Sequence, residues 1–260
     1  MDSEAFVDLF VLAQVSAFHS MLTLYKVLLA PALLLQGSRL RKTALRLPEA
    51  AGERSGHIHG NGAQPLRLLF TGDSSAAGVG VDWQHQALAQ QAAQLVAARS
   101  GRSVQWTLIA QSGANTRDAI ALIKAQANGP ADVVISALGV NDVTSQTSAR
   151  RFVQDYNELL TVVAQRTGAR AAVISGLPPL HKLPAAPQPL RWYLGQCAWR
   201  LDEALQQFSA QRPDTSFVSL AWAKASEMAR DKFHPGRSQY QQWAALVAEQ
   251  VLAVAPRSGP

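Results

Sequence analysis

The chain has 260 residues, of which 48% are hydrophobic and 16% are charged, and its formal net charge is +6. These values exclude a disordered chain, and the length allows one large α/β domain or two small ones. A single cysteine, Cys197, excludes an internal disulfide and a cysteine-based zinc site, and no RNA- or DNA-binding signature accompanies the basic excess.

The first 46 residues form an apolar segment with a basic end. Residues 5–35 are rich in Leu, Val, Ala and Phe, interrupted by Asp8, His19 and Lys26. These three residues fall on one side of a helix of about 3.6 residues per turn. The segment therefore predicts a mostly apolar helix with a narrow polar seam, ending at or near Pro31.

The basic end of this segment leaves three interpretations open. Arg39, Arg41, Lys42 and Arg46 follow the apolar run. The helix could lie in a membrane interface with this cluster on anionic headgroups, or cross the membrane with the cluster in the cytoplasm. It could also dock on its own domain or on a second copy of the chain. Residues 5–46 are thus candidates for contact with a membrane surface or for homo-oligomerisation.

The acidic start of the chain, with Asp2 and Glu4, lacks the basic opening of a secretory signal. We therefore expect no cleavable signal peptide and a cytoplasmic location, with the inner face of the membrane as the site of any contact.

Residues 47–65 contain two prolines and four glycines and read as a linker. From residue 66 to residue 260 we expect one catalytic domain, preceded by this linker and by the segment 1–46.

Strand-like and helix-like runs alternate within residues 66–260. The expected strands are 66–71, 104–110, 132–138, 170–175 and 215–220, and the expected helices are 84–100, 116–127, 147–167, 191–211 and 238–254. The strands are apolar without clean alternation, which is typical of a sheet covered on both faces. The pattern therefore predicts an α/β domain with a parallel sheet flanked by helices.

Polar motifs follow several of these strands. Ser74 comes after the first strand, Gly113 after the second and the run 139–142 after the third, and Asp231 and His234 follow the fifth. In such sheets ligands bind at the carboxyl ends of the strands. We therefore expect these residues to meet at one edge of the sheet.

The residue types at this edge fit nucleophilic catalysis. A serine is a weak nucleophile until a base takes its proton, and His234 is such a base. Asp231 can accept from Nδ1 of His234 and leave Nε2 free for Ser74. The backbone N–H groups of Ser74 and Gly113 and the amide of Asn141 can donate to an oxyanion. Each motif by itself is also compatible with a helix cap, a turn or a surface histidine.

Taken together, four blocks resemble the SGNH hydrolase family, also called GDSL-type esterases and lipases. They are Gly72-Asp73-Ser74, the Gly113 block, Gly139-Val-Asn141-Asp142 and Asp231-x-x-His234-Pro235, and they span roughly residues 66–254. Ser75 stands where the family name has leucine, and we treat it as structural.

The resemblance implies a three-layer α/β/α, flavodoxin-like domain with a five-stranded parallel sheet. It also implies Ser74 as nucleophile, His234 as base, Asp231 as its orienting acid and an oxyanion hole from Ser74, Gly113 and Asn141. Such an enzyme needs no metal or cofactor.

The expected activity is a two-step hydrolysis of short or medium acyl or aryl esters, which are small-molecule substrates. The proline-rich loop 176–190 and several aromatic residues supply the candidates for substrate binding. They are Trp83, Pro179, His181 and Trp192. The alternatives are an O-deacetylase of a glycan, an acyltransferase to a lipid-linked alcohol, and a membrane-attached scaffold with an inactive hydrolase fold.

Overall fold

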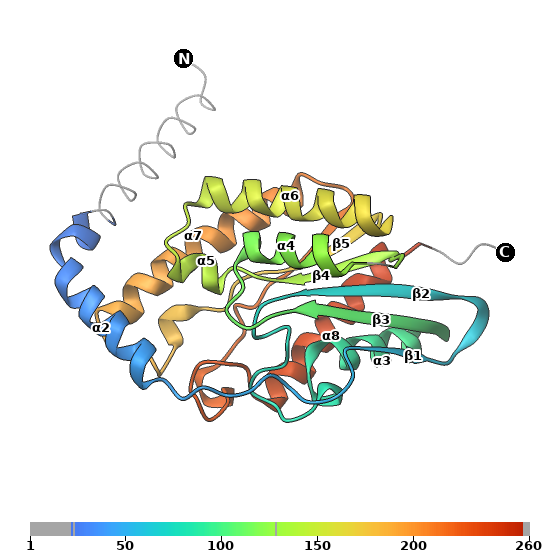
Figure 1. Ribbon diagram of the computed structural model, residues 1–260, viewed down its shortest axis with the longest axis horizontal. Coiled ribbons are helices and arrows are strands. Elements are labelled where there is room, and N and C mark those ends of the chain that lie inside the picture. Colours follow the sequence, from blue (N-terminus) through green and yellow to red (C-terminus); the bar gives the residue numbers. More distant parts are fainter. Residues whose placement is uncertain (1–21, 23, 128, 257–260) are drawn as a thin grey trace, which may run out of the picture.

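A computed structural model describes residues 22, 24–127 and 129–256, which form a sheet between two layers of helices (Figure 1). The strands are β1 (Ser55–Ile58), β2 (Asn61–Gly72), β3 (Arg102–Ala110), β4 (Val133–Ala137), β5 (Ala171–Ser175) and β6 (Thr215–Val218). The helices are α2 (Ala30–Thr43), α3 (Leu88–Ser100), α4 (Thr116–Gln126), α5 (Val140–Thr144), α6 (Ala149–Thr167), α7 (Leu190–Ala210) and α8 (Arg237–Val254). Short 3₁₀ turns cover Gln84–Gln86, Leu180–Lys182 and Ala225–Glu227.

The sheet has the strand order β1-β3-β2-β4-β5-β6. Strands β2 to β6 pair in parallel, so their carboxyl ends lie at one edge. This confirms the predicted α/β fold with five parallel strands. A sixth strand, β1, pairs antiparallel with β3 and was not predicted.

The predicted linker 47–65 is wrong for its second half. Residues 55–58 form β1, and β2 begins at Asn61 rather than near Leu66. The glycines and prolines of this segment suggested a loop, but pairing with β3 holds its backbone in the sheet. Such pairing with a distant strand outweighs local propensity.

Side chains of neighbouring strand residues enter different cores. In β2, Leu68 and Phe70 pack in the cluster built with α3 and α8, whereas Leu69 packs in the cluster built with α4, α6 and α7. Both faces of the sheet are thus apolar and covered (Figure 1), which explains why the strands lack a polar alternation.

The helix boundaries follow local signals in the sequence. Asn115 and Asp118 form a capping box at the start of α4, in which each side chain accepts from the backbone of the other. The side chain of Ser148 accepts from Arg151 N–H at the start of α6. Helices α3 and α6 end at Gly101 and Gly168, which have left-handed backbones.

Most of the predicted N-terminal apolar helix lies outside the described residues. Residues 24–28 are helical, and this run ends before Pro31, as predicted. A second helix, α2, then begins at Ala30, so Pro31 lies in its first turn. Proline fits there because the first N–H groups of a helix have no intrahelical partner. No helix in the described part of the chain is both long and apolar enough to cross a bilayer.

Helix α2 docks on α7. The side chain of Gln36 donates to Gln188 O at 2.8 Å and accepts from Leu190 N at 3.1 Å. The ring of Tyr25 lies 4.3 Å from that of Trp192, measured between centroids. One face of the N-terminal helical region is therefore in contact with the domain, close to the loop that precedes α7.

A buried carboxylate joins α4 to α5. The backbone N–H and the hydroxyl of Thr116 donate to Asp142 Oδ2 at 3.1 and 3.0 Å. Burial raises the pKa of Asp142 to about 6, the hydrogen bonds from Thr116 lower it in part, and the charge of Asp155 raises it further. Asp73 is also within electrostatic reach of Asp142.

This geometry gives a pH dependence of stability. The unfolded chain loses the Asp142 proton near pH 3.9, whereas the folded chain retains it to about pH 6. Between these values the folded state binds more protons, so the free energy of unfolding falls as pH rises, by at most about 1.4 kcal/mol per unit for this group. We expect Asp142→Asn to remove this contribution.

Urea unfolding of both proteins from pH 4 to pH 8 measures it, and acids that do not interact with Asp142 cancel in the difference. A difference in unfolding free energy that stays constant between pH 4 and pH 6 would contradict the assignment.

Candidate active site

Ser74, His234 and Asp231 form a continuous chain of hydrogen bonds. His234 Nε2 lies 2.8 Å from Ser74 Oγ, and His234 Nδ1 lies 2.6 Å from Asp231 Oδ2. Ser74 follows the end of β2, and the other two residues lie in the loop before α8. The structure thus brings together three residues that the sequence placed at one edge of the sheet.

The loop that carries His234 is fixed by its own backbone. Asp231 Oδ1 accepts from the N–H groups of Phe233 and His234 at 3.0 and 3.1 Å. Met228 and Pro235 form an antiparallel bridge across the base of the loop. The side chain of Asp231 is 2% exposed and that of His234 is 16% exposed, so the imidazole alone reaches toward solvent.

Asp231 remains ionised in this environment. Burial alone would raise its pKa, but the hydrogen bonds from the His234 ring and from two backbone amides outweigh it and hold the pKa below its usual value. A charged carboxylate on Nδ1 favours the tautomer in which Nε2 is free to accept from Ser74.

The loop after Ser74 packs directly under the histidine loop. Gly80 has a φ of +110°, and a Cβ at this position would lie 2.3 Å from Pro235 O. The buried hydroxyl of Tyr240 contacts the carbonyls of Ser75 and Val79 at 2.9 and 2.8 Å. Glycine at 80 and the phenol of α8 therefore set the distance between the serine and histidine loops.

Gly113 and Asn141 lie in adjoining segments at the same edge. Gly113 has a φ of +84° and occupies the turn after β3, and Asn141 lies in α5 after β4. Asn141 Nδ2 donates to Ala114 O at 3.0 Å, which ties α5 to the turn. Within the described part of the chain, no acceptor is hydrogen-bonded to the backbone N–H of Ser74 or Gly113.

Asp73 is a buried acid between these segments. Its Oδ1 accepts from Ser75 N at 2.9 Å, and its Oδ2 lies 3.5 Å from Asn141 Nδ2. Burial raises the pKa of Asp73 to about 7, the Ser75 amide offsets part of this, and the charge of Asp142 adds to it. Near neutral pH Asp73 is therefore partly protonated.

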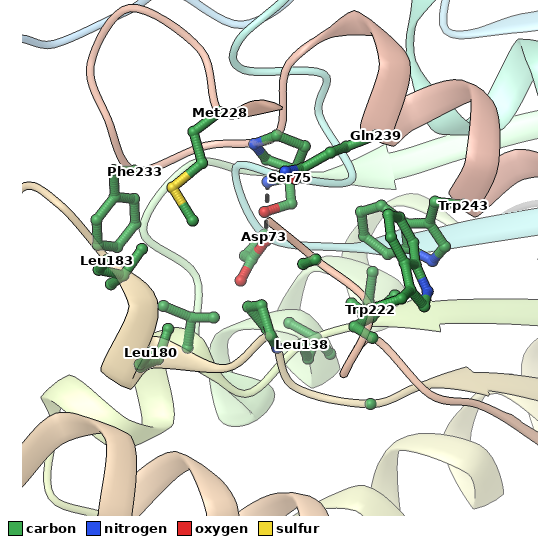
Figure 2. Close-up of a pocket in the computed structure, with 17 residues that line it drawn as sticks. Asp73, Ser75, Leu138, Leu180, Leu183, Trp222, Met228, Phe233, Gln239 and Trp243 are labelled. Carbon is green, nitrogen blue, oxygen red and sulfur yellow. Dashed lines mark hydrogen bonds between the residues drawn. The ribbon is translucent and has the colours of Figure 1, made fainter. Parts of the chain in front are cut away.

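An apolar cavity of about 50 Å³ lies beside the hydroxyl–imidazole pair. Figure 2 shows Leu180, Leu183 and Phe233 on one side and Trp222 and Trp243 on the other. The neighbours of Ser74 and His234 in the chain also line it, namely Asp73, Ser75, Phe233 and Pro235.

None of the four predicted substrate-binding residues lines this cavity. Trp83 is 52% exposed, and the ring of Trp192 packs on Tyr25. His181 is exposed in the turn Leu180–Lys182, and the loop presents Pro178 rather than Pro179 to the cavity. The loop 176–190 lines the cavity through Gly176, Pro178, Leu180 and Leu183, but its sequence gave no signal for which of its side chains point inward. Contact of these four residues with a substrate stays a prediction.

The sequence also gave no role to Glu49 and Arg54, in the predicted linker. Glu49 Oε1 accepts from Ser112 N at 2.7 Å, and Arg54 Nη1 donates to Ala110 O at 2.7 Å. Both residues thus hold the turn of Gly113. A long-range contact of this kind has no local sequence signal.

Solved structures of similar fold cover most of this chain. A lipase/acylhydrolase from Enterococcus faecalis is 16% identical, with a TM-score of 0.57 over 75% of this chain and 100% of that one. Est24, a carbohydrate acetylesterase from Sinorhizobium meliloti, is 17% identical, with a TM-score of 0.56 over 73% and 99%. The structure of TesA is 19% identical, with a TM-score of 0.56 over 72% and 99%. Curated protein sequences gave no match.

The GDSL-like Lipase/Acylhydrolase family matches residues 70–242, which is about two thirds of the chain and includes all four blocks of the site. The fold, the family match and the edge that gathers these blocks agree. The chain belongs to the GDSL-like lipase/acylhydrolase family and is an ester hydrolase of that family.

Proposed function

We propose that this protein hydrolyses carboxylic esters with short acyl groups through a Ser74 acyl-enzyme. The observation that carries the proposal is the chain of hydrogen bonds at 2.8 and 2.6 Å from Ser74 through His234 to Asp231. In this arrangement Ser74 is the nucleophile, His234 the general base and Asp231 the acid that orients it.

The reaction proceeds in two steps. Ser74 Oγ attacks the ester carbonyl while His234 Nε2 takes its proton, and the imidazolium then gives this proton to the leaving alcohol. Water, activated by the same imidazole, attacks the acyl-enzyme and frees the acid. The N–H groups of Ser74 and Gly113 and the amide of Asn141 stabilise the oxyanion. Asn141 must first turn one N–H away from its present acceptors, Ala114 O or Asp73.

Ser74→Ala tests the nucleophile. We expect hydrolysis of p-nitrophenyl acetate to fall by about three orders of magnitude or more, because no other group in the chain of hydrogen bonds can form the acyl-enzyme. A fluorophosphonate probe should label the wild type and not the variant.

Ser75→Ala is the matched control, since it removes the adjacent hydroxyl and keeps the N–H that Asp73 accepts. It should still be labelled. Near-full activity of Ser74→Ala, or labelling that moves with Ser75, would show that the assignment is wrong.

The cavity supports a preference for short acyl groups. Its walls are mainly aliphatic and aromatic, and its volume of about 50 Å³ holds only a few water-sized groups. Leu180 closes one side and is 2% exposed. An acyl chain on Ser74 that enters this space gains the burial of its methylene groups until it meets that wall.

Leu180→Ala should therefore shift the preference toward longer acyl chains. We expect the ratio of kcat/KM for hexanoyl over acetyl p-nitrophenyl esters to rise by about 10-fold, since each accommodated methylene is worth about 1–3 kcal/mol. Leu159→Ala is the control, because Leu159 is fully buried but does not line the cavity.

Both variants should lose about 2–5 kcal/mol of stability. If both change the ratio equally, or neither does, the acyl group does not occupy this cavity.

Two alternative reactions would use the same site. An O-deacetylase of a glycan, the activity named for Est24, would cleave acetylated polysaccharide but not p-nitrophenyl esters. An acyltransferase to a lipid-linked alcohol would transfer the acyl group faster than it releases the acid. The accessible apolar cavity favours simple acyl esters, and a comparison of these three substrates separates the possibilities. A scaffold without activity would fail to react with the fluorophosphonate probe.

The outer face of the N-terminal helical region supports contact with an anionic membrane surface. While one face packs on α7, Leu24, Val27, Leu28, Leu34 and Leu35 are 58–71% exposed on the helices. Residues 22–48 contain five basic residues and no acidic one, in a chain whose net charge is +6. An apolar face bordered by Lys and Arg is typical of helices that lie in the lipid interface.

A second copy of the chain fits this face less well. A two-fold contact between the C-terminal ends of α2 would bring two identical basic clusters together, and no acidic residue within 22–48 would offset their repulsion. Negative headgroups neutralise the cluster instead. We therefore propose that residues 22–46 bind the membrane surface, with the cytoplasmic leaflet as the expected location.

Flotation with lipid vesicles tests this proposal. The full-length protein should float with vesicles containing phosphatidylglycerol and less with pure phosphatidylcholine, and added salt should weaken binding. Leu34→Ser with Leu35→Ser, and Arg39→Gln with Arg41→Gln and Lys42→Gln, should each reduce flotation.

Arg150, Arg166 and Arg170 are exposed near α6, and replacing all three with Gln is the charge-matched control. Equal loss in this control, or concentration-dependent dimers that vanish in the leucine variant, would point away from the membrane.

A further inference from the structure

The segment 49–54, here called the strap, lies outside the matched family region 70–242 and crosses the carboxyl edge of the sheet. It links α2 to β1, which pairs with β3 at the far end of the strap. The ion pair of Glu49 and Arg54 closes the strap on itself. The ion pair therefore connects the two ends of the strap.

One side of the strap holds the turn that carries Gly113. Glu49 Oε1 accepts from Ser112 N at 2.7 Å, directly before Gly113 in the chain. Arg54 Nη1 donates to Ala110 O at 2.7 Å, at the end of β3. Both ends of the short run from Ala110 to Ser112 are thus hydrogen-bonded to the ion pair.

The other side of the strap holds the loop that follows the nucleophile. Ala50 N donates to Ala77 O at 3.2 Å, and Ala51 N donates to Asp82 O at 2.9 Å. The side-chain amide of Gln84, which is 2% exposed, lies within hydrogen-bonding distance of both Ala50 O and Ala77 O. The strap and this loop are therefore joined by buried as well as exposed hydrogen bonds.

From these contacts we infer that the Glu49–Arg54 pair positions the backbone N–H of Gly113 relative to that of Ser74. The pair is a positioning device for the oxyanion hole, and it acts through Ser112 and Ala110 without touching the substrate. This inference rests on the proposed function, because only an acyl transfer needs these two donors to converge.

The physical argument is the steep dependence of oxyanion stabilisation on geometry. Gly113 has a left-handed backbone, and a Cβ at this position would meet nothing within 4 Å, so no side-chain packing fixes the direction of its N–H. Asn141 holds the following residue through Ala114 O, and the strap holds the preceding one. Without the strap the turn loses the hydrogen bond to Ser112 N and keeps those made by Asn141, by Ala114 N to Gln111 O at 3.1 Å and by Gln111 N to Gly72 O at 3.2 Å.

Kinetics of Glu49→Ala test the inference. A displaced donor affects the tetrahedral state more than the bound ester, so we expect kcat for p-nitrophenyl acetate to fall about 10-fold or more with KM nearly unchanged. Inhibition by benzeneboronic acid, which forms a tetrahedral adduct on the serine, should weaken by the same factor. Arg54→Lys keeps the charge but loses the planar fork and should also lower kcat.

Two variants serve as controls. Glu49→Gln keeps an acceptor for Ser112 N–H and loses the charge, so it should recover much of kcat. Glu158→Ala removes the glutamate of an exposed ion pair with Lys124, between α4 and α6, and should leave kcat and boronic-acid inhibition as in the wild type. Fluorophosphonate titration gives the fraction of active protein in each sample, so kcat refers to folded enzyme.

The outcomes separate the two proposals. Active wild type with equal kcat in Glu49→Ala and Glu158→Ala would overturn the positioning role. A fall in kcat without a matching loss of boronic-acid inhibition would mean that the pair supports the fold alone, and it would also overturn the inference. If Glu49→Ala does not fold, the contrast of Arg54→Lys with Glu49→Gln decides in the same way. Wild type that neither hydrolyses esters nor takes the label refutes the proposed function, and the inference falls with it.

Discussion

A hydrogen bond between two residues 160 positions apart is the constraint on which the site depends. Ser74 Oγ and His234 Nε2 lie 2.8 Å apart only because β2 and the loop before α8 end at the same edge of the sheet. Parallel pairing of five strands brings their carboxyl ends together, and α8 packs against β4, β5 and β6 from one face. The position of the catalytic residues therefore depends first on the parallel direction of the strands.

The two carboxyl groups on either side of this hydrogen bond, Asp231 and Asp73, have pKa values shifted in opposite directions. On the histidine side, Asp231 is charged and accepts three hydrogen bonds, so it holds the ring without competing for its proton. On the serine side, Asp73 is a buried acid whose pKa of about 7 keeps it partly neutral. At Asp73 the cost of burying the charge dominates, and the charge of Asp142 adds to it. At Asp231 the hydrogen bonds from His234 and Phe233 and the charge of His234 outweigh that cost.

The sequence was sufficient for features with a local signal. The parallel strands and the residues Ser74, Asp231 and His234 at one edge were recognisable from apolar runs and short motifs. The helix α5 was not, because Gly139 to Asp142 also reads as a turn and the helix is only five residues long.

Features built from distant contacts left no such signal. Strand β1 exists because β3 pairs with it, and Glu49 matters because it meets Ser112, 63 positions further along the chain. The inward side chains of loop 176–190 were also missed, since a proline-rich loop has no period from which to infer direction. The composition of residues 47–65 indicated a linker, but residues 55–58 form the edge strand β1 because they pair with β3.

Strand β1 has a further consequence for the sheet it completes. It pairs with residues 104–107 of β3, whose outer backbone groups would otherwise face solvent unpaired. A protein shortened to begin at Asn61 would keep β2 but would uncover this part of β3 and invite self-association through strand addition. Strand β1 therefore protects this edge of the sheet against aggregation.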